Sequence, residues 1–145
     1  MSKISLSTNK SADVILIRKD RAIILQVRDD IPTISNPGCA STFGGHIEPD
    51  EEPIDAALRE VNEETNLSLR KDCLAFYALK HIDKENYGLD LDIYYYLAKD
   101  IDDSNLKVFE GAGHIVVHNE QELSQAKPTR IVKEVVEQLL SELHP

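Results

Sequence analysis

The chain has 145 residues, a length that suits one domain built around one core. Its formal net charge of −10 disfavours a nucleic acid duplex as the main partner, because phosphate backbones select basic surfaces. A small phosphorylated partner stays compatible with this charge where a metal ion supplies positive charge locally. The sequence contains no apolar run of about 18 residues and no signal-peptide core, so we expect a cytoplasmic protein without a membrane partner.

The first third of the chain predicts a β-hairpin followed by a loop. Residues 12–17 and 22–27 are β-rich apolar runs, and the charged turn between them is typical of a hairpin. Residues 28–38 contain two prolines and a glycine, so we expect a loop there. A short strand around residues 39–43 then leads into a pair of glycines (44–45), which permit unusual backbone conformations and the close approach of a ligand.

The clearest helix is predicted over residues 53–65. One apolar face is defined by residues at helical spacing, namely Ile54, Ala57, Leu58 and Val61. Pro53 suits the first turn of a helix, and the three acidic residues before it favour the positive end of the helix dipole. We therefore expect this helix to bury its apolar face.

The second half of the chain predicts two longer strands, a shorter strand and a final helix. The strand-like runs are residues 73–82, 91–98 and 115–117, and a helical pattern spans residues 128–143. Strands therefore lie on both sides of the first helix in the sequence and precede the second one. This order indicates a single domain over residues 1–145 of the α/β (α+β) class, an α/β/α sandwich with a mixed sheet between helices.

Three glutamates lie beside the apolar face of the predicted helix. Glu60, Glu63 and Glu64 are spaced i, i+3 and i+4, so their side chains converge on one helical surface. Like charges at this spacing repel, and a hard divalent cation compensates them well because carboxylate oxygens suit Mg²⁺. Arg59 precedes them and can hold one carboxylate through a bidentate pair. A solvated acidic face is the alternative explanation of this spacing alone.

The segment from Gly45 to Leu67, GHIEPDEEPIDAALREVNEETNL, extends this pattern. It resembles the Nudix box, G-x5-E-x7-R-E-U-x-E-E-x-G-U, where U is a bulky aliphatic residue. The final glycine of the box is Asn66 here. That glycine usually ends the helix with a positive φ, and asparagine is the next-best residue for such a conformation. The matching residues are Gly45, Glu51, Arg59, Glu60, Val61, Glu63, Glu64 and Leu67.

The resemblance implies the Nudix fold and a site for Mg²⁺, with Mn²⁺ as the alternative metal. Carried over, Glu60 and Glu64 are direct metal ligands. Glu63 is a ligand or the base that activates water, and the backbone carbonyl of Gly45 often completes the metal shell. A further carboxylate from a late loop often joins such a site, and Glu110 is the candidate here. An exposed loop glutamate is the alternative for that residue.

Four further residues are expected to support this site. By the same resemblance, Arg59 and Glu51 orient the carboxylates that bind the metal. Phe109 can anchor the loop of Glu110 by burial, and Gly111 lets that loop bend toward the site.

The implied function is the hydrolysis of a diphosphate linkage in a nucleoside triphosphate or a related nucleoside diphosphate compound, by metal-activated attack of water on phosphorus. A nucleoside diphosphate sugar or ADP-ribose hydrolase is the alternative enzyme. A non-catalytic domain that senses a nucleotide is the alternative of a different class. The partner is in each case a small nucleotide-like phosphorylated molecule, bound by a monomer or a homodimer.

Residues that choose the substrate lie outside the box. Arg28 is a candidate contact for phosphate, with an ordinary surface charge as the alternative. Tyr94, Tyr95 and Tyr96 alternate along a predicted strand, so at least one ring faces inward, where it either stacks on a base or fills the core. The sequence leaves the substrate and the metal preference open.

Overall fold

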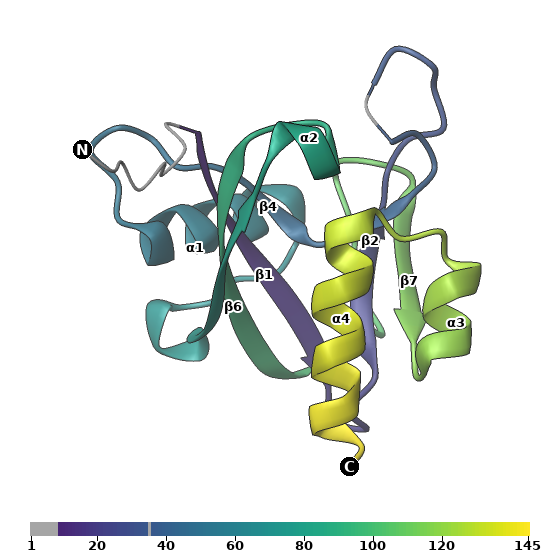
Figure 1. Ribbon diagram of the computed structural model, residues 1–145. Helices are drawn as coiled ribbons and strands as arrows, with labels where there is room; N and C mark the ends of the chain where they lie inside the picture. Colours follow the sequence, from purple (N-terminus) through teal and green to yellow (C-terminus); the bar gives the residue numbers. More distant parts are fainter. Residues whose placement is uncertain (1–8, 35) are drawn as a thin grey trace.

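The computed structural model describes residues 9–34 and 36–145, which form a mixed sheet with helices on both faces, the expected α/β/α sandwich (Figure 1). The strands are β1 (Lys10–Arg18), β2 (Ile23–Val27), β3 (Ala40–Ser41), β4 (Phe43–His46), β5 (Ala75–Ile82), β6 (Leu91–Ile101) and β7 (Gly113–Val117). The helices are α1 (Pro53–Glu64), α2 (Lys84–Tyr87), α3 (Glu120–Gln125) and α4 (Arg130–Leu143), with a 3₁₀ turn, η1, at Lys71–Cys73.

The sheet divides beside strand β1, and this division positions the site. One edge of β1 pairs in parallel with β6. Its other edge pairs with β2 through Leu16 and Ile17, and with β4 through residues 11–14. Strand β2 pairs further along with β3 and β7. The strands β1 and β2 diverge from one another. The segment formed by β3, Thr42 and β4 lies between them, because β3 pairs with β2 and β4 pairs with β1.

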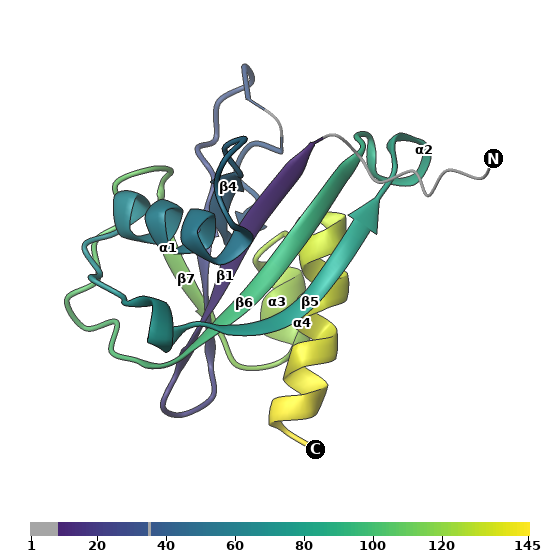
Figure 2. The same cartoon turned by 90° about the vertical axis from the view of Figure 1, so that its left-hand side faces the viewer.

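Two apolar cores cover the two faces of the sheet. On one face, Val14 of β1 packs in a cluster with Val61 of α1. On the other face, Ile15 of β1 packs in a cluster with Leu123 of α3 and Val136 of α4. Alternate residues of β1 thus enter opposite cores, as the pleat of a strand requires. Figure 2 shows α1 and α4 on opposite sides of the sheet.

Helix α1 follows its predicted range closely, but its buried face differs in detail. Val61 is fully buried, as expected, whereas Ile54 and Leu58 are only partly buried. Ala57, which was also expected on this face, is fully buried, and so is Ala56, which was not expected there. Their small side chains allow the helix backbone to approach the sheet closely, and this leaves the longer side chains at the margin.

Other elements differ from their predicted boundaries where the sequence pattern that predicts them is short. The predicted hairpin is confirmed, but the glycine pair (44–45) lies inside strand β4 and does not follow a strand. Helix α3 was not predicted, because its six residues bury only Leu123 and start on the cap of Asn119, which accepts a hydrogen bond from Glu122. Within the described ranges, no helix is both long and apolar enough to cross a membrane.

Candidate active site

Two carboxylates of helix α1 reach strand β4 from one face of the sheet. Glu64 is buried, with 5% of the residue exposed, and its Oε1 accepts a hydrogen bond of 3.0 Å from the backbone N–H of Gly44. Glu60 lies one helical turn earlier, against Gly45. A Cβ atom added to Gly45 would stand 2.5 Å from the carboxyl carbon of Glu60. A side chain at position 45 would therefore have to displace the Glu60 carboxylate, whereas the φ of Gly45 is not among the positive values that favour glycine.

Arg59 ties the Glu60 carboxylate to the segment before the helix. Its Nε and Nη2 donate to the two oxygens of Glu51 at 2.8 and 2.9 Å, a bidentate pair. Its Nη1 donates to Glu60 at 2.9 Å and lies 3.6 Å from Glu63. The bonds from Arg59 and from the N–H of Glu48 lower the pKa of Glu51 to about 2. Arg59 thus fixes Glu60, while the Glu63 side chain stays 60% exposed.

Glu64 faces negative charge, and no Lys, Arg or His among the described residues forms a salt bridge with it. Burial raises the pKa of Glu64 to about 9, and the charges of Glu110 and Glu60 raise it further, against the Gly44 N–H, which lowers it. In the described part of the chain, no three His, Cys, Asp or Glu side chains are arranged to hold a metal as they stand. Mg²⁺ commonly takes only one or two carboxylates and keeps several waters, so the oxygen donors of Glu60 and Glu64 fit such an ion.

The loop that carries Glu110 is held against the end of α1. The N–H of Phe109 donates to the Glu64 carbonyl at 2.7 Å, and the Gln26 side chain donates to the Glu110 carbonyl at 2.7 Å. Gly111 bends the chain with a φ of +89°, as expected. The expected burial of Phe109 is wrong, because the residue is 64% exposed. Hydrogen bonds to the backbone of Phe109 and Glu110 anchor this loop, and the aromatic ring does not.

Asn66, which replaces the final glycine of the box, does not take the expected left-handed conformation. Helix α1 is followed by Thr65 in an extended conformation with φ of −134°, and Asn66 is not among the residues with positive φ. Its side chain donates to the Asn105 carbonyl at 2.9 Å and accepts from the Lys107 N–H at 2.8 Å. Asparagine therefore ties the end of α1 to the segment that leads to Glu110, which glycine could not do.

The opposite side of β4 holds a carboxylate that sequence reasoning missed. Asp13 on β1 pairs with Gly44, and a Cβ atom added to Gly44 would stand 2.5 Å from Oδ1 of Asp13. That Oδ1 accepts a hydrogen bond of 2.8 Å from the Ser11 hydroxyl, and Oδ2 accepts one from the Thr42 hydroxyl. Burial raises the pKa of Asp13 to about 6, although both hydroxyls lower it. The signal available in the sequence was a charged residue inside the apolar run 12–17.

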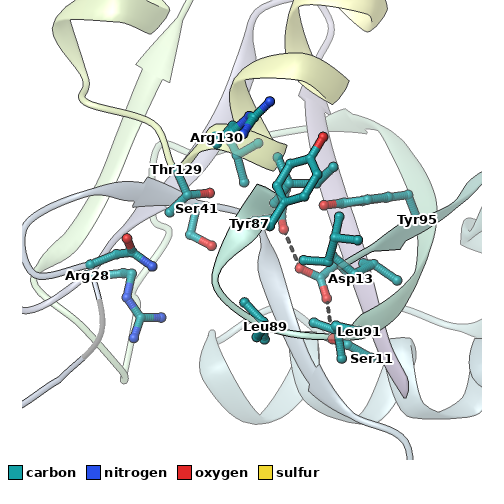
Figure 3. Close-up of a pocket in the computed structure, with 16 residues that line it drawn as sticks. Ser11, Asp13, Arg28, Ser41, Tyr87, Leu89, Leu91, Tyr95, Thr129 and Arg130 are labelled. Carbon is teal, nitrogen blue, oxygen red and sulfur yellow. Dashed lines mark hydrogen bonds between the residues drawn. The ribbon is translucent and has the colours of Figure 1, made fainter. Parts of the chain in front are cut away.

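Asp13 lines a cavity of about 260 Å³ between the sheet and the start of α4, here named the Asp13 cavity (Figure 3). The alternation predicted at least one inward ring, and both Tyr95 and Tyr96 are buried, in opposite cores. Tyr95 lines the cavity, and Figure 3 shows its hydroxyl directed toward Asp13 and Tyr87. The guanidinium of Arg130 lies 4.6 Å from the centre of the Tyr87 ring. The remaining lining residues are Ser11, Arg28, Asn36, Ser41, Thr42, Ile82, Leu89, Leu91, Ile93, Thr129, Ile131 and Val132.

Arg28 is shared by the Asp13 cavity and the pocket of Glu110. Besides that cavity it lines a second pocket of about 130 Å³, together with Gln26, Asp29 and Glu110. Glu110 in turn lies near enough to Glu64 for its charge to raise the pKa of that residue. One positively charged residue therefore lines both the cavity and the pocket of Glu110.

Comparison with known proteins identifies the family of this chain. The model of the NUDIX domain matches residues 7–138. Among curated proteins, none matches the sequence.

Solved structures of MutT-like proteins share this architecture. The MutT protein of Methanosarcina mazei Go1 is similar with a TM-score of 0.75 and 16% identity, over 99% of this chain and 100% of that one. The dihydroneopterin triphosphate pyrophosphohydrolase of E. coli is similar with a TM-score of 0.68 and 14% identity, over 92% and 95% of the two chains. An Ap4A hydrolase of C. elegans is similar with a TM-score of 0.67 and 20% identity, over 93% and 94%. At these identities the likeness shows a common fold.

Proposed function

This chain belongs to the Nudix family, and from that membership we propose that it is a metal-dependent hydrolase of the diphosphate linkage in a nucleoside triphosphate or a related nucleoside diphosphate compound. One observation carries the proposal. The buried Glu64 carboxylate faces the charges of Glu110 and Glu60, and it forms no salt bridge with a Lys, Arg or His of the described ranges. A divalent cation relieves this repulsion and, at the same place, neutralises the phosphates of a substrate.

Glu60 and Glu64 are the residues that would hold Mg²⁺ or Mn²⁺, with Glu110 and the Gly45 carbonyl as further oxygen donors. When bound, the metal would neutralise phosphate charge and make a water molecule more acidic, which favours in-line attack on phosphorus. Glu63 is partly free of Arg59 and more exposed than Glu60, so it is the carboxylate that can turn toward an incoming water or metal.

Arg59 and Glu51 act as positioning residues in this proposal. Their bidentate pair and the bond from Arg59 to Glu60 hold one carboxylate oriented before any substrate arrives. Such prior orientation lowers the barrier, because little reorganisation is left for the moment of reaction. The Arg59 guanidinium also donates to the His46 carbonyl at 3.2 Å, which fixes the helix to the end of β4.

The substrate would extend from the Asp13 cavity to the acidic cluster. Its nucleoside portion fits the cavity, and Arg28 lies where the phosphate chain would pass toward Glu110. The proteins of similar fold from E. coli and C. elegans are named for a triphosphate and a dinucleoside polyphosphate, and both names describe phosphoanhydride substrates. This agreement supports a substrate with a phosphoanhydride linkage for the present chain.

The proposal is tested by incubating the purified protein with Mg²⁺ or Mn²⁺ and a panel of nucleoside triphosphates, dinucleoside polyphosphates, nucleotide sugars and ADP-ribose. Products are identified by chromatography and ³¹P NMR. We expect a nucleoside monophosphate and pyrophosphate from a triphosphate, and no turnover with excess chelator. Preferred cleavage of nucleotide sugars would show that the substrate is a nucleotide sugar and not a triphosphate. Binding of a compound without hydrolysis of any would favour a nucleotide sensor over an enzyme. Full activity in the presence of chelator would overturn the metal-dependent mechanism.

A further inference from the structure

The Asp13 carboxylate takes no part in the proposed hydrolysis, yet it is held in a fixed orientation. Each of its oxygens accepts a hydrogen bond from one hydroxyl, of Ser11 on one side and of Thr42 on the other. A carboxylate has about four lone-pair positions, so these two bonds leave acceptor capacity unused. Because Asp13 lines the cavity, the unused capacity is available to a molecule inside it.

The surroundings of Asp13 suit a flat heterocycle. Apolar side chains from β5, β6 and α4 form the walls, among them Ile82, Leu91 and Val132. The Tyr95 hydroxyl also reaches the cavity, and no hydrogen bond joins it to another described residue. An apolar slot with a few convergent polar groups is the usual form of a ligand site. The slot therefore offers a carboxylate acceptor and a phenolic donor to the edge of one ring system.

We propose that Asp13 selects the base of the substrate, and that this base is a 2-amino-oxo heterocycle of the guanine type. The inference rests on the proposed function, which brings a nucleotide to this site. Among the common nucleobases, guanine is the one that presents two adjacent N–H donors, one on the ring and one on the 2-amino group, to the two oxygens of a carboxylate. Its neighbouring carbonyl accepts from the Tyr95 hydroxyl. Adenine, cytosine and uracil each place an acceptor where Asp13 offers only acceptors.

The position of the cavity agrees with the path of the phosphates. A base bound by Asp13 lies on the α4 face of the sheet, and Arg28 lines both this cavity and the pocket of Glu110. The two faces of β4 thereby have different functions in this proposal. Asp13 contacts the base beside Gly44, and Glu60 lies beside Gly45, where the phosphates end.

The test measures binding without turnover. Calorimetry of the wild-type protein with guanosine, inosine, xanthosine and adenosine monophosphates is compared with the same titrations of Asp13→Asn. Inosine monophosphate differs from guanosine monophosphate only by lacking the 2-amino group. We expect the guanosine compound to bind the wild type about 10- to 100-fold more tightly than the inosine and adenosine compounds, the scale of a lost hydrogen bond to a charged group. Asp13→Asn should lose this preference and gain affinity for xanthosine, whose 2-oxo group accepts from an amide.

Asp92→Asn is the matched control, since Asp92 is a buried carboxylate on β6 that pairs with His81 and does not line the cavity. It should keep the wild-type order of affinities. Equal binding of all four compounds by the wild type, or an equal loss of all four in Asp13→Asn, would overturn the inference. If Asp13→Asn does not fold, the wild-type comparison of the guanosine and inosine compounds decides alone. Selective binding without hydrolysis of the triphosphate would overturn the proposed enzyme and leave the base selection standing.

Discussion

Gly44 and Gly45 are consecutive residues of strand β4, and the carboxylates on their two sides differ in origin. Beside Gly45 lies Glu60, carried by a helix whose residue spacing predicts an acidic face. Beside Gly44 lies Asp13, carried by a neighbouring strand with no such pattern around it. A side chain at position 44 would collide with the Ala12 carbonyl and with Asp13, and one at position 45 would have to displace the Glu60 carboxylate. One strand thus separates the proposed reaction chemistry from the proposed base recognition.

The largest effect is expected from removing charge on the α1 side. Glu64→Gln keeps the size of the side chain and its bond to Gly44 N–H, but it removes the charge that would bind the metal. We expect kcat to fall by about 10² or more, the scale for losing one key electrostatic group. Steady-state kinetics with the preferred triphosphate measures this. Glu120→Gln, at an exposed position on α3, is the control and should leave kcat unchanged.

Glu110→Gln tests whether the loop that carries Glu110 belongs to the same metal site as the α1 carboxylates. If Glu110 completes the metal site, kcat should fall by about 10-fold or more while KM stays within a few-fold. A larger change in KM than in kcat would place Glu110 among the residues that only line the pocket. Unchanged values of both would remove it from the site, and the base would then have to come from the Glu60–Glu64 helix.

Arg59→Lys should have a smaller effect, through the positioning of Glu60. Lysine keeps the positive charge but cannot donate to both oxygens of Glu51 and to Glu60 at once. We expect the Mg²⁺ concentration for half-maximal activity to rise about 10-fold, the lower end of the effect of losing a residue that orients a metal ligand. An unchanged Mg²⁺ requirement would show that the orientation of Glu60 does not depend on this pair.

The smallest effect concerns the stability of the metal-free protein. The pKa of Glu64 is raised from its ordinary value of 4.5 to about 9, so the folded state favours the protonated form. This contribution to stability is complete below about pH 4.5 and is lost as the pH rises toward about 9. We expect the melting temperature to fall by about 5 °C between pH 6.5 and 9, a range above the pKa of Asp13. Glu64→Gln should reduce the slope, and an identical slope in both proteins would contradict the assignment.

The regular elements and the α1 side could be predicted because their patterns are local. Helical periodicity predicts the range of α1, and the i, i+3, i+4 spacing of Glu60, Glu63 and Glu64 is enough to place them on one surface of that helix. Short elements such as α3 were missed because six residues with one buried side chain carry too little periodicity.

The surroundings of Asp13 and the role of Asn66 could not be predicted, because they depend on contacts between segments that are distant in the sequence. The surroundings of Asp13 are formed by residues that are distant in the sequence. Strand pairing places Gly44 beside it, and the Thr42 hydroxyl donates a hydrogen bond to its carboxylate. Asn66 was expected to act through its own backbone, and it acts through hydrogen bonds to Asn105 and Lys107. Both are side-chain contacts across the fold, for which the sequence around each residue gives no spacing rule.

The most direct test of the central claim is a calorimetric titration of Mn²⁺ into the wild-type protein and into Glu64→Gln at about pH 7.5, in two buffers with different ionisation enthalpies. Because Glu64 is protonated at this pH without a cation, a metal bound there must displace its proton. We predict that binding to the wild type releases about one proton, and that Glu64→Gln loses both the tight binding and the release. Binding of equal affinity to both proteins, without proton release, would contradict the claim that the α1 carboxylates form the metal site.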